Sequence, residues 1–212
     1  LWDKYPVEQV ATPEGYARNP ELVINFYNER RKQLLDVVPN AGHLGVADLE
    51  RDFNVTVVTQ NVDNLHERAG STHVIHLHGE LTKVCSSRDP YNPHFVKELA
   101  PEEYEVKLGD KAGDGTQLRP FIVWFGESVP EIETAIRYVE QADIFVIIGT
   151  SLNVYPAAGL LNYVPRAAEV YLIDPKPVDT HVMRPIHVIQ KGASEGVKEL
   201  KALLTVTQPP LP

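Results

Sequence analysis

Cysteine is nearly absent from this sequence, in which Cys85 is the single example. One cysteine excludes an internal disulfide framework and fits a reducing compartment, so we expect a cytoplasmic protein. Long apolar runs are absent too, since none approaches the roughly 20 residues that a membrane-spanning helix needs. The chain opens at Leu1 without an initiating methionine and without a signal-peptide pattern.

Positive charge is also scarce. The 20 lysines and arginines face 29 aspartates and glutamates, which gives a formal net charge of −9 and a pI near 5.4. Non-specific binding to nucleic acids or anionic membranes needs a basic surface, so both are excluded as partners. Hydrophobic residues make up 43% of the 212 residues, which indicates a globular chain with a sizeable core in one main domain.

Polar side chains follow two apolar runs within residues 59–79, TQNVDNLHERAGSTHVIHLHG. The preceding run NVTVV is β-branched and predicts a strand buried on both faces, so Gln60, Asn61 and Asp63 would emerge at its carboxyl end. The run THVIHLHG predicts a second strand that carries His78 to its own end. Ligands of open parallel sheets bind at such ends, and we therefore expect one crevice there.

The remaining elements alternate between helices and strands. Asn19 followed by Pro20 predicts a helix start, and the apolar spacing continues the helix over residues 20–35. Parallel βαβ winding is the natural architecture for the carboxyl-terminal half. The other expected helices lie at 40–51, at 64–69 before Gly70, at 130–142, at 156–163 and from 194 to 204, and the other strands at 121–125, 144–150, 169–173 and 187–190. Residues 82–118 are rich in turn residues and predict a small inserted module, while 207–212 predict a disordered tail.

The stretch TQNVDNLHERAG followed by HLHGE resembles the core of the sirtuin family, the NAD-dependent protein-lysine deacylases. Similar pieces follow in the family's order: RPFIVWFGE at 119–127, IIGTSLNVYPAAGL at 147–160, YLIDP at 171–175 and KGAS at 191–194. The resemblance covers most of residues 1–204.

The resemblance implies an α/β fold with a Rossmann-like parallel sheet and helices on both faces. Its NAD-binding domain would comprise residues 1–81 and 119–206, with the small module at 82–118 and the tail at 207–212. In the family a first strand and a GAGxS-type turn precede a Gly-Leu-Trp of which Leu1 and Trp2 are present here. We therefore expect that an amino-terminal part of the domain is missing.

His78 is the candidate general base, because imidazole titrates near neutral pH and the strand end places it at the crevice. In sirtuins the histidine directly before glycine deprotonates a ribose hydroxyl after nicotinamide has left, and the acyl group ends on ADP-ribose. By the same resemblance Asn61 belongs to the catalytic set. His76 points to the same face of the strand and is the rival, and a purely structural role is the alternative for either histidine.

The resemblance also assigns the NAD-binding residues. Amide and carboxylate groups can hold ribose hydroxyls and a carboxamide, which need both donors and acceptors. Turn and cap chemistry is the alternative for the asparagine and aspartate side chains. The cofactor set is Gln60, Asn61, Asp63, Gly149, Thr150, Ser151, Asp174 and Ala193, of which Asp174 would accept the adenosine ribose hydroxyls and Ala193 would border the adenine.

The resemblance implies that the substrate is an acylated lysine in a protein or peptide. By resemblance, Val123, Phe125, Gly126 and Glu127 form an edge that pairs with the substrate backbone, and Val154 and Tyr155 lie on its opposite side. Such a peptide would be bound as an added strand. Core packing is the alternative for Val123 and Phe125.

Tyr27 and Arg30 concern the acyl group. Residues three apart share a helix face, and an arginine binds a carboxylate in bidentate fashion while a tyrosine hydroxyl adds a third bond. In sirtuins a Tyr-x-x-Arg pair on this helix marks enzymes that prefer succinyl- or malonyl-lysine, so acetyl-lysine would be the weaker substrate. The alternative is a core-facing tyrosine beside a solvated arginine.

Most sirtuins bind a structural zinc through two Cys-x-x-Cys pairs in the module, where this chain has only Cys85 and His94. One cysteine cannot form a tetrahedral thiolate site, so we expect no such zinc, a buried Cys85 and a module held by packing alone. The candidate packing residues are Tyr91, Phe95, Leu99 and Tyr104. Two other functions stay open: a non-catalytic module that binds NAD or ADP-ribose, and an NAD hydrolase or ADP-ribosyltransferase.

Overall fold

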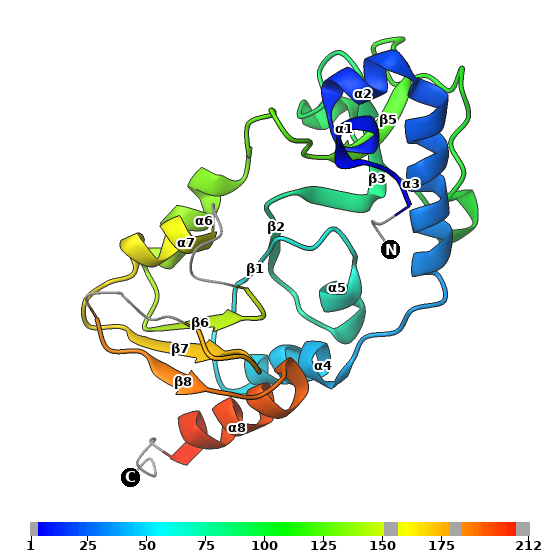
Figure 1. The fold of residues 1–212 in the computed structure, drawn as a ribbon. Helices are drawn as coiled ribbons and strands as arrows, with labels where there is room; N and C mark the ends of the chain where they lie inside the picture. Colours follow the sequence, from blue (N-terminus) through cyan, green and yellow to red (C-terminus); the bar gives the residue numbers. More distant parts are fainter. Residues whose placement is uncertain (1–3, 151–156, 179–183, 207–212) are drawn as a thin grey trace. The chain divides into compact units, whose positions relative to one another are not determined.

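The computed structural model describes residues 4–150, 157–178 and 184–206, which form helices and both parallel and antiparallel strands (Figure 1). The chain divides into two compact units. The first comprises Leu1–Val38, Val58–Asn64 and His76–Pro130, and the second comprises Pro39–Val57, Leu65–Ile75 and Glu131–Pro212. The helix expected at 20–35 lies in the same unit as residues 82–118. Among the described residues, no helix is both long enough and apolar enough to cross a membrane.

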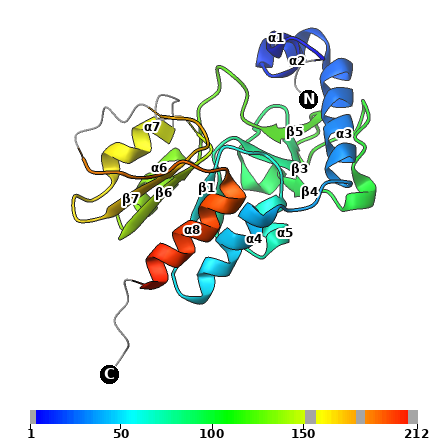
Figure 2. The ribbon, with the colours of Figure 1, turned by 60° about the horizontal axis from the view of Figure 1, so that its bottom comes forward.

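In the first unit a long helix, α3, lies beside an antiparallel sheet with the strand order β4-β3-β5 (Figure 2). Its elements are α1 (Val7–Val10), α2 (Pro13–Arg18), α3 (Pro20–Leu34), β3 (Gly79–Ser86), η2 (Pro93–Phe95), β4 (Lys97–Glu98), η3 (Pro101–Glu103) and β5 (Leu118–Ile122). The side chain of Asn19 caps α3 by accepting a hydrogen bond from the amide of Leu22, and Pro20 follows the cap. The expected start of this helix is confirmed.

Strand β5 corrects two expectations. It ends at Ile122, whereas a strand over 121–125 was expected, and it pairs antiparallel with β3 instead of joining a parallel βαβ unit. The chain turns after the strand, because the amide of Glu127 donates to the carbonyl of Trp124 and Gly126 has a φ of 91°. An apolar run predicts that a strand exists, but it does not reveal the strand's partner.

Apolar side chains from α1, α3, β3 and β5 form the main core of the first unit. The buried members are Val10, Val23, Phe26, Tyr27, Leu81, Ile122 and Trp124. A second cluster joins Ile24 of α3 to Val84 and Val106, and Leu99 packs against it. Helix α3 therefore contributes to both clusters.

Residues 82–118 are held by hydrogen bonds from α3 in addition to packing. The Asn28 side chain donates to the carbonyl of Val106 (2.7 Å) and accepts from its amide (2.9 Å), while Arg31 Nε donates to the carbonyl of Tyr104 (2.8 Å). Burial lowers the pKa of Arg31 to about 10. The expectation of packing alone was incomplete, because a backbone without regular structure still needs hydrogen-bond partners when it is buried.

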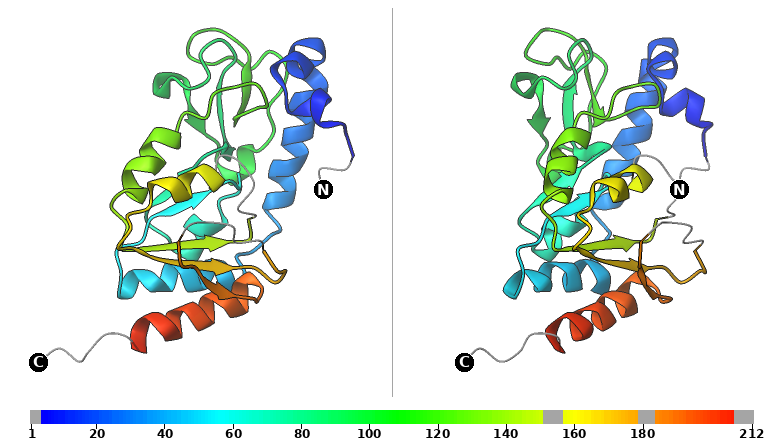
Figure 3. Two further views of the ribbon diagram at one scale, coloured as in Figure 1. Left: turned by 60° about the vertical axis from the view of Figure 1, so that its left-hand side comes forward. Right: turned by 90° about the vertical axis from the view of Figure 1, so that its left-hand side faces the viewer.

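The second unit contains a parallel sheet with the order β6-β7-β8. In Figure 3, α6 and α7 lie on one side of this sheet, and α4 and α8 lie on the other. Its elements are α4 (Ala41–Asp48), η1 (Leu49–Arg51), α5 (Leu65–Ala69), α6 (Ile132–Val139), β6 (Ile144–Ile148), α7 (Ala157–Leu160), η4 (Leu161–Tyr163), β7 (Glu169–Ile173), β8 (His187–Ile189) and α8 (Ala193–Val206). The predicted fold class, a Rossmann-like parallel sheet with helices on both faces, is confirmed.

Two short strands, β1 (Val57–Thr59) and β2 (Val74–His76), pair with each other. The amide of Val57 donates to the carbonyl of His73 (3.0 Å), and the amide of Leu77 donates to the carbonyl of Thr59 (2.9 Å). Gly70 follows α5 with a φ of 111°, which confirms its expected place at the end of that helix. Strand β1 begins later than the apolar run predicted.

Candidate active site

The two candidate histidines differ in their surroundings. His76 is buried, and its Nδ1 donates to the carbonyl of Asn61 at 3.0 Å. His78 is half-buried in the turn between β2 and β3, and its ring makes no hydrogen bond within the part of the chain that the structure describes. Its backbone carbonyl accepts from the amide of Val123 at 2.9 Å. The ring of His78 is thus the one with free nitrogens and access to solvent.

Gly79 explains how His78 is placed. This glycine has a φ of 89°, and a Cβ built on it would lie 2.1 Å from the carbonyl oxygen of Phe121. Only glycine tolerates both the positive φ and the close approach of strand β5. The His-Gly pair is therefore a structural unit: the glycine lets the two strands meet, and the histidine lies next to the junction.

A polar cluster follows β1. The amide of Asn61 donates to Thr59 Oγ1 at 3.0 Å, which turns the chain away from the strand. Among the described residues, the carboxamide groups of Gln60 and Asn61 make no hydrogen bond, and the buried Oδ1 of Asn64 has no partner. Amide groups that no described residue binds suit a polar ligand.

The second unit holds the other predicted cofactor residues that the structure describes. Gly149 follows β6 with a φ of 65°, and its amide donates to the carbonyl of Ile173 at 3.1 Å. Thr150 comes next and is half-buried. Asp174 follows β7, and its Oδ1 accepts a hydrogen bond from the amide of Lys176 at 2.8 Å. One carboxylate oxygen of Asp174 therefore stabilises the local turn. Ala193 begins α8.

The predicted peptide-binding edge is a turn at the end of β5. Phe125 occupies its tip with 69% of its surface exposed, whereas the Trp124 side chain beside it is buried. The amide of Phe125 donates to the carbonyl of Ala11 at 3.0 Å, and the amide of Val123 is bonded to His78 as described above. The carbonyls of Val123 and Phe125 accept no hydrogen bond from the described residues. This edge can therefore offer acceptors to a ligand backbone.

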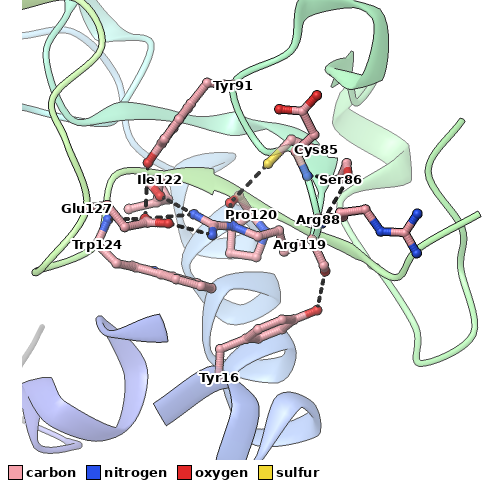
Figure 4. Close-up of polar contacts among 12 residues, drawn as sticks. Tyr16, Cys85, Ser86, Arg88, Tyr91, Arg119, Pro120, Ile122, Trp124 and Glu127 are labelled. Atoms are coloured by element: carbon pink, nitrogen blue, oxygen red, sulfur yellow. Dashed lines mark hydrogen bonds and ion pairs between the residues drawn. The ribbon is translucent and has the colours of Figure 1, made fainter. Parts of the chain in front are cut away.

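Figure 4 shows an ion pair between Arg119, which lies in β5, and Glu127, which ends this turn. Arg119 Nη1 and Nη2 donate to Glu127 Oε2 (2.9 Å) and Oε1 (3.0 Å), and the guanidinium carbon lies 3.8 Å from the ring centroid of Trp124. Glu127 Oε1 also accepts from the amide of Trp124 (2.8 Å) and from the hydroxyl of Tyr91 (3.1 Å). Arg119 is 4% exposed.

These contacts set the charge state of the pair. Burial opposes ionisation of Glu127, but the hydrogen bonds and charge of Arg119, with the amide of Trp124 and the hydroxyl of Tyr91, hold the pKa of its carboxyl below the ordinary value. Burial also acts against the charge of Arg119, and Glu127 outweighs it and raises the pKa of Arg119. Both groups are charged at neutral pH.

Tyr27 and Arg30 lie on α3 as the spacing predicts, and both are buried. The Tyr27 hydroxyl donates to the carbonyl of Val10 (2.9 Å) and accepts from the indole Nε1 of Trp124 (3.0 Å). Burial raises the pKa of Tyr27 to about 12. Arg30 Nη1 donates to Gln33 (3.2 Å), and its guanidinium lies over the ring of Phe26. Tyr27 is thus core-facing, as the alternative stated, whereas Arg30 is not solvated.

Three predicted residues, Ser151, Val154 and Tyr155, lie outside the described residues. The sequence did not single out Arg119, Tyr91 or Trp124 as site residues. Arg119 and Trp124 occur in the motif RPFIVWFGE, so the motif itself contained that signal. Tyr91 is 36 residues from its partner Glu127 and gives no local signal.

The comparison with known proteins gives a consistent assignment. The sequence model of the Sir2 family matches residues 1–156. A protein described as an NAD-dependent protein deacylase from Bacteroides thetaiotaomicron is 84% identical over 204 residues, which cover 96% of this chain and 87% of the relative. A deacylase of the same description from Helicobacter pylori strain 26695 is 46% identical and covers 94% of this chain and 85% of its own length.

Comparison with solved structures points to the same family. A Sir2 homolog in complex with NAD has a TM-score of 0.80 and 35% sequence identity, and the match covers 97% of this chain and 80% of that structure. The match thus includes both the parallel sheet of the second unit and the segment that carries His78. The chain belongs to the Sir2 family, the sirtuins.

Proposed function

We propose that this NAD-dependent protein deacylase removes succinyl and malonyl groups from lysine side chains in preference to acetyl groups. The observation that carries the proposal is the arginine of the Tyr27–Arg30 pair, which is only 8% exposed although it stands one turn from the end of a surface helix. Burying a guanidinium costs free energy, and the cost is offset when it binds a carboxylate. An acidic acyl group supplies that carboxylate, and an acetyl group does not.

The two residues would contribute unequally. The hydroxyl of Tyr27 already spends its single proton on the carbonyl of Val10, so it can donate to an acyl carboxylate only if that hydrogen bond breaks. The bond that it accepts from Trp124 can persist. Arg30 carries a permanent positive charge and five N–H donors in a planar fork that matches a carboxylate, so we assign most of the acyl preference to Arg30.

NAD fits the polar groups after β1. The carboxamides of Gln60 and Asn61 and the buried Oδ1 of Asn64 offer donors and acceptors of the kind that a nicotinamide carboxamide and ribose hydroxyls require. NAD supplies a ribose carbon open to attack by the acyl oxygen, a leaving nicotinamide and a hydroxyl that receives the acyl group. Gly149, Thr150, Asp174 and Ala193 remain the candidates for its phosphate and adenosine parts.

His78 would act as the general base. Its half-buried imidazole accepts the proton of a ribose hydroxyl at a ring nitrogen that no described residue occupies. The ring of His76 is occupied by Asn61 and is the weaker candidate. Asn61 thus presents its carbonyl to His76 and its side chain to the ligand.

The peptide would bind along the turn at Val123–Glu127. The carbonyls of Val123 and Phe125 accept from the substrate backbone, and the exposed ring of Phe125 covers its apolar parts.

Cys85 is buried in β3, and its Sγ donates to the carbonyl of Pro120 at 3.7 Å. We infer that the 82–118 segment uses no thiolate-bound zinc.

Competing turnover of matched peptides tests the acyl preference. Succinyl-lysine and acetyl-lysine peptides of one sequence are incubated with NAD, and the products are quantified by mass spectrometry, with His78→Ala as the inactive control. Arg30→Met should lower kcat/KM for the succinyl peptide by about 10- to 100-fold, the loss expected for hydrogen bonds to a charged group, and change the acetyl value little. Arg18→Met removes an exposed arginine of the same unit and should change neither value.

Equal losses for both peptides in Arg30→Met would refute the acidic-acyl proposal. Nicotinamide release in the absence of any acyl peptide would indicate NAD hydrolysis as the main activity instead.

A further inference from the structure

The carboxylate of Glu127 is fully engaged within the protein. Its Oε1 accepts three hydrogen bonds, from Arg119, from the Trp124 amide and from Tyr91, and its Oε2 accepts one from Arg119. The positions of Oε1 are thus all taken, Oε2 is bonded to the guanidinium, and the side chain of Glu127 is only 15% exposed. The motif suggested a substrate contact for Glu127, whereas its carboxylate is directed at the residues of its own turn and sheet.

The same contacts connect the turn to the sheet. Arg119 Nη2 donates to the carbonyl of Ile122, the last residue of β5, and the same nitrogen reaches Glu127. The guanidinium also covers one face of the Trp124 ring, whose Nε1 donates to Tyr27. One cation thus fixes the end of the strand, the buried side chain within the turn and the residue that closes the turn (Figure 4).

An ion pair of this kind is a poor way to gain stability. Removing two charges from water costs about as much as their attraction returns, so apolar residues of similar size often serve stability equally well. A planar, bidentate pair with two further hydrogen bonds to its carboxylate does fix geometry, because each hydrogen bond restricts direction as well as distance. What it fixes here is the turn whose tip exposes Phe125 and in which the carbonyls of Val123 and Phe125 accept no hydrogen bond from the described residues.

We propose that Arg119, Glu127 and Tyr91 form a positioning network that holds the Val123–Glu127 turn in the shape needed to bind the substrate backbone. The inference rests on the proposed role of this turn in peptide binding, and it gives Glu127 a role through the turn instead of a substrate contact. The network should matter for substrates with backbone on both sides of the acyl-lysine and not for an isolated acyl-lysine.

The test compares two acyl substrates with each variant. One is a peptide with several residues on each side of the acyl-lysine, and the other is a single acyl-lysine blocked at both ends. Glu127→Gln should raise KM for the peptide by about tenfold, and Tyr91→Phe should raise it less, because it removes one of the four hydrogen bonds. The kcat, the KM for NAD and the KM for the blocked lysine should stay within about twofold.

Tyr16→Phe is the matched control. Tyr16 also packs against Trp124, but its hydroxyl bonds to Ser87 instead of Glu127, so its removal deletes one side-chain hydrogen bond outside the network. A purely structural role would lower kcat through a smaller folded fraction and leave both KM values unchanged. That result, or equal increases in KM for the two substrates, would overturn the proposal.

Calorimetric binding of the same peptide in the presence of NAD supplies the comparison independently of turnover. Wild type should bind the peptide more tightly than the blocked lysine, and Glu127→Gln should lose this advantage. Wild type that binds both equally overturns the network's role. Acetyl substrates serve as well as succinyl ones, so failure of the acyl preference leaves this test intact.

Discussion

The hydroxyl of Tyr27 allows a quantitative test of the core of the first unit. Tyr27→Phe removes one oxygen, which donates to the carbonyl of Val10 and accepts from the indole of Trp124. All three residues are at most 2% exposed, so water cannot replace the lost partner. The substitution leaves two buried polar groups unsatisfied and creates almost no cavity.

The expected cost follows from those two groups. An unsatisfied buried donor or acceptor costs about 1–3 kcal/mol, so Tyr27→Phe should lower the free energy of unfolding by about 2–6 kcal/mol. Tyr16→Phe is the control, because its hydroxyl makes one half-buried bond to Ser87, whose Oγ keeps a second bond to the carbonyl of Gln117. Its cost should be about 1 kcal/mol or less.

Urea unfolding followed by tryptophan fluorescence measures both variants. A Trp2→Phe background leaves Trp124 as the sole tryptophan of the chain, so the signal reports the unit that contains Tyr27. Equal losses of unfolding free energy in the two variants, or a loss below about 0.5 kcal/mol in Tyr27→Phe, would contradict this reasoning. The two hydrogen bonds of the Tyr27 hydroxyl would then not stabilise the core. The hydroxyl would then be available to bind substrate.

Three further results are expected. Gly79→Ala should lower the free energy of unfolding by more than about 3 kcal/mol and displace His78, because the added Cβ would meet the carbonyl of Phe121. Gly109 also has a positive φ, 99°, but a Cβ there would meet nothing within 4 Å, so Gly109→Ala should cost about 1 kcal/mol. Thermal unfolding measures both variants. Cys85, whose pKa burial raises to about 12 from an ordinary 9.0, should resist iodoacetamide in the native protein at pH 8 and react in urea, and stability should fall as the pH rises from 9 towards 12. Elemental analysis should find no stoichiometric zinc, and chelators should leave the melting temperature unchanged; one zinc per chain would contradict the zinc-free interpretation.

Local signals predicted local structure well. Asn19 and Pro20 marked the start of α3, and Asn40 capped α4 where a helix was expected, with His43 completing a capping box that the sequence had not suggested. The parallel strands of the second unit were readable as apolar runs of the right length. In each case the determining atoms lie within a few residues of one another.

Long-range partners were not predictable in the same way. The antiparallel pairing of β5 with β3 depends on the close approach at Gly79. The carboxylate of Glu127 accepts hydrogen bonds from Tyr91 and Arg119, which lie far from it in the sequence or in another element. The motif named Glu127 as a site residue but could not show that its carboxylate faces inward. Likewise, nothing in the spacing of Tyr27 and Arg30 indicated that the tyrosine hydroxyl would be shared between α1 and Trp124.

One network joins the proposed acyl-binding and peptide-binding features of the first unit. Tyr27, beside the proposed acyl-binding arginine, bonds to Trp124; Trp124 lies against Arg119; and Arg119 pairs with Glu127, which closes the peptide-binding turn. Residues in one hydrogen-bonded network do not contribute additively, so the proposed binding sites for the acyl group and the peptide backbone are coupled. Changes aimed at acyl preference through Tyr27 should therefore also alter peptide affinity, whereas changes at Arg30, which stacks on Phe26, act on the acyl group more separately.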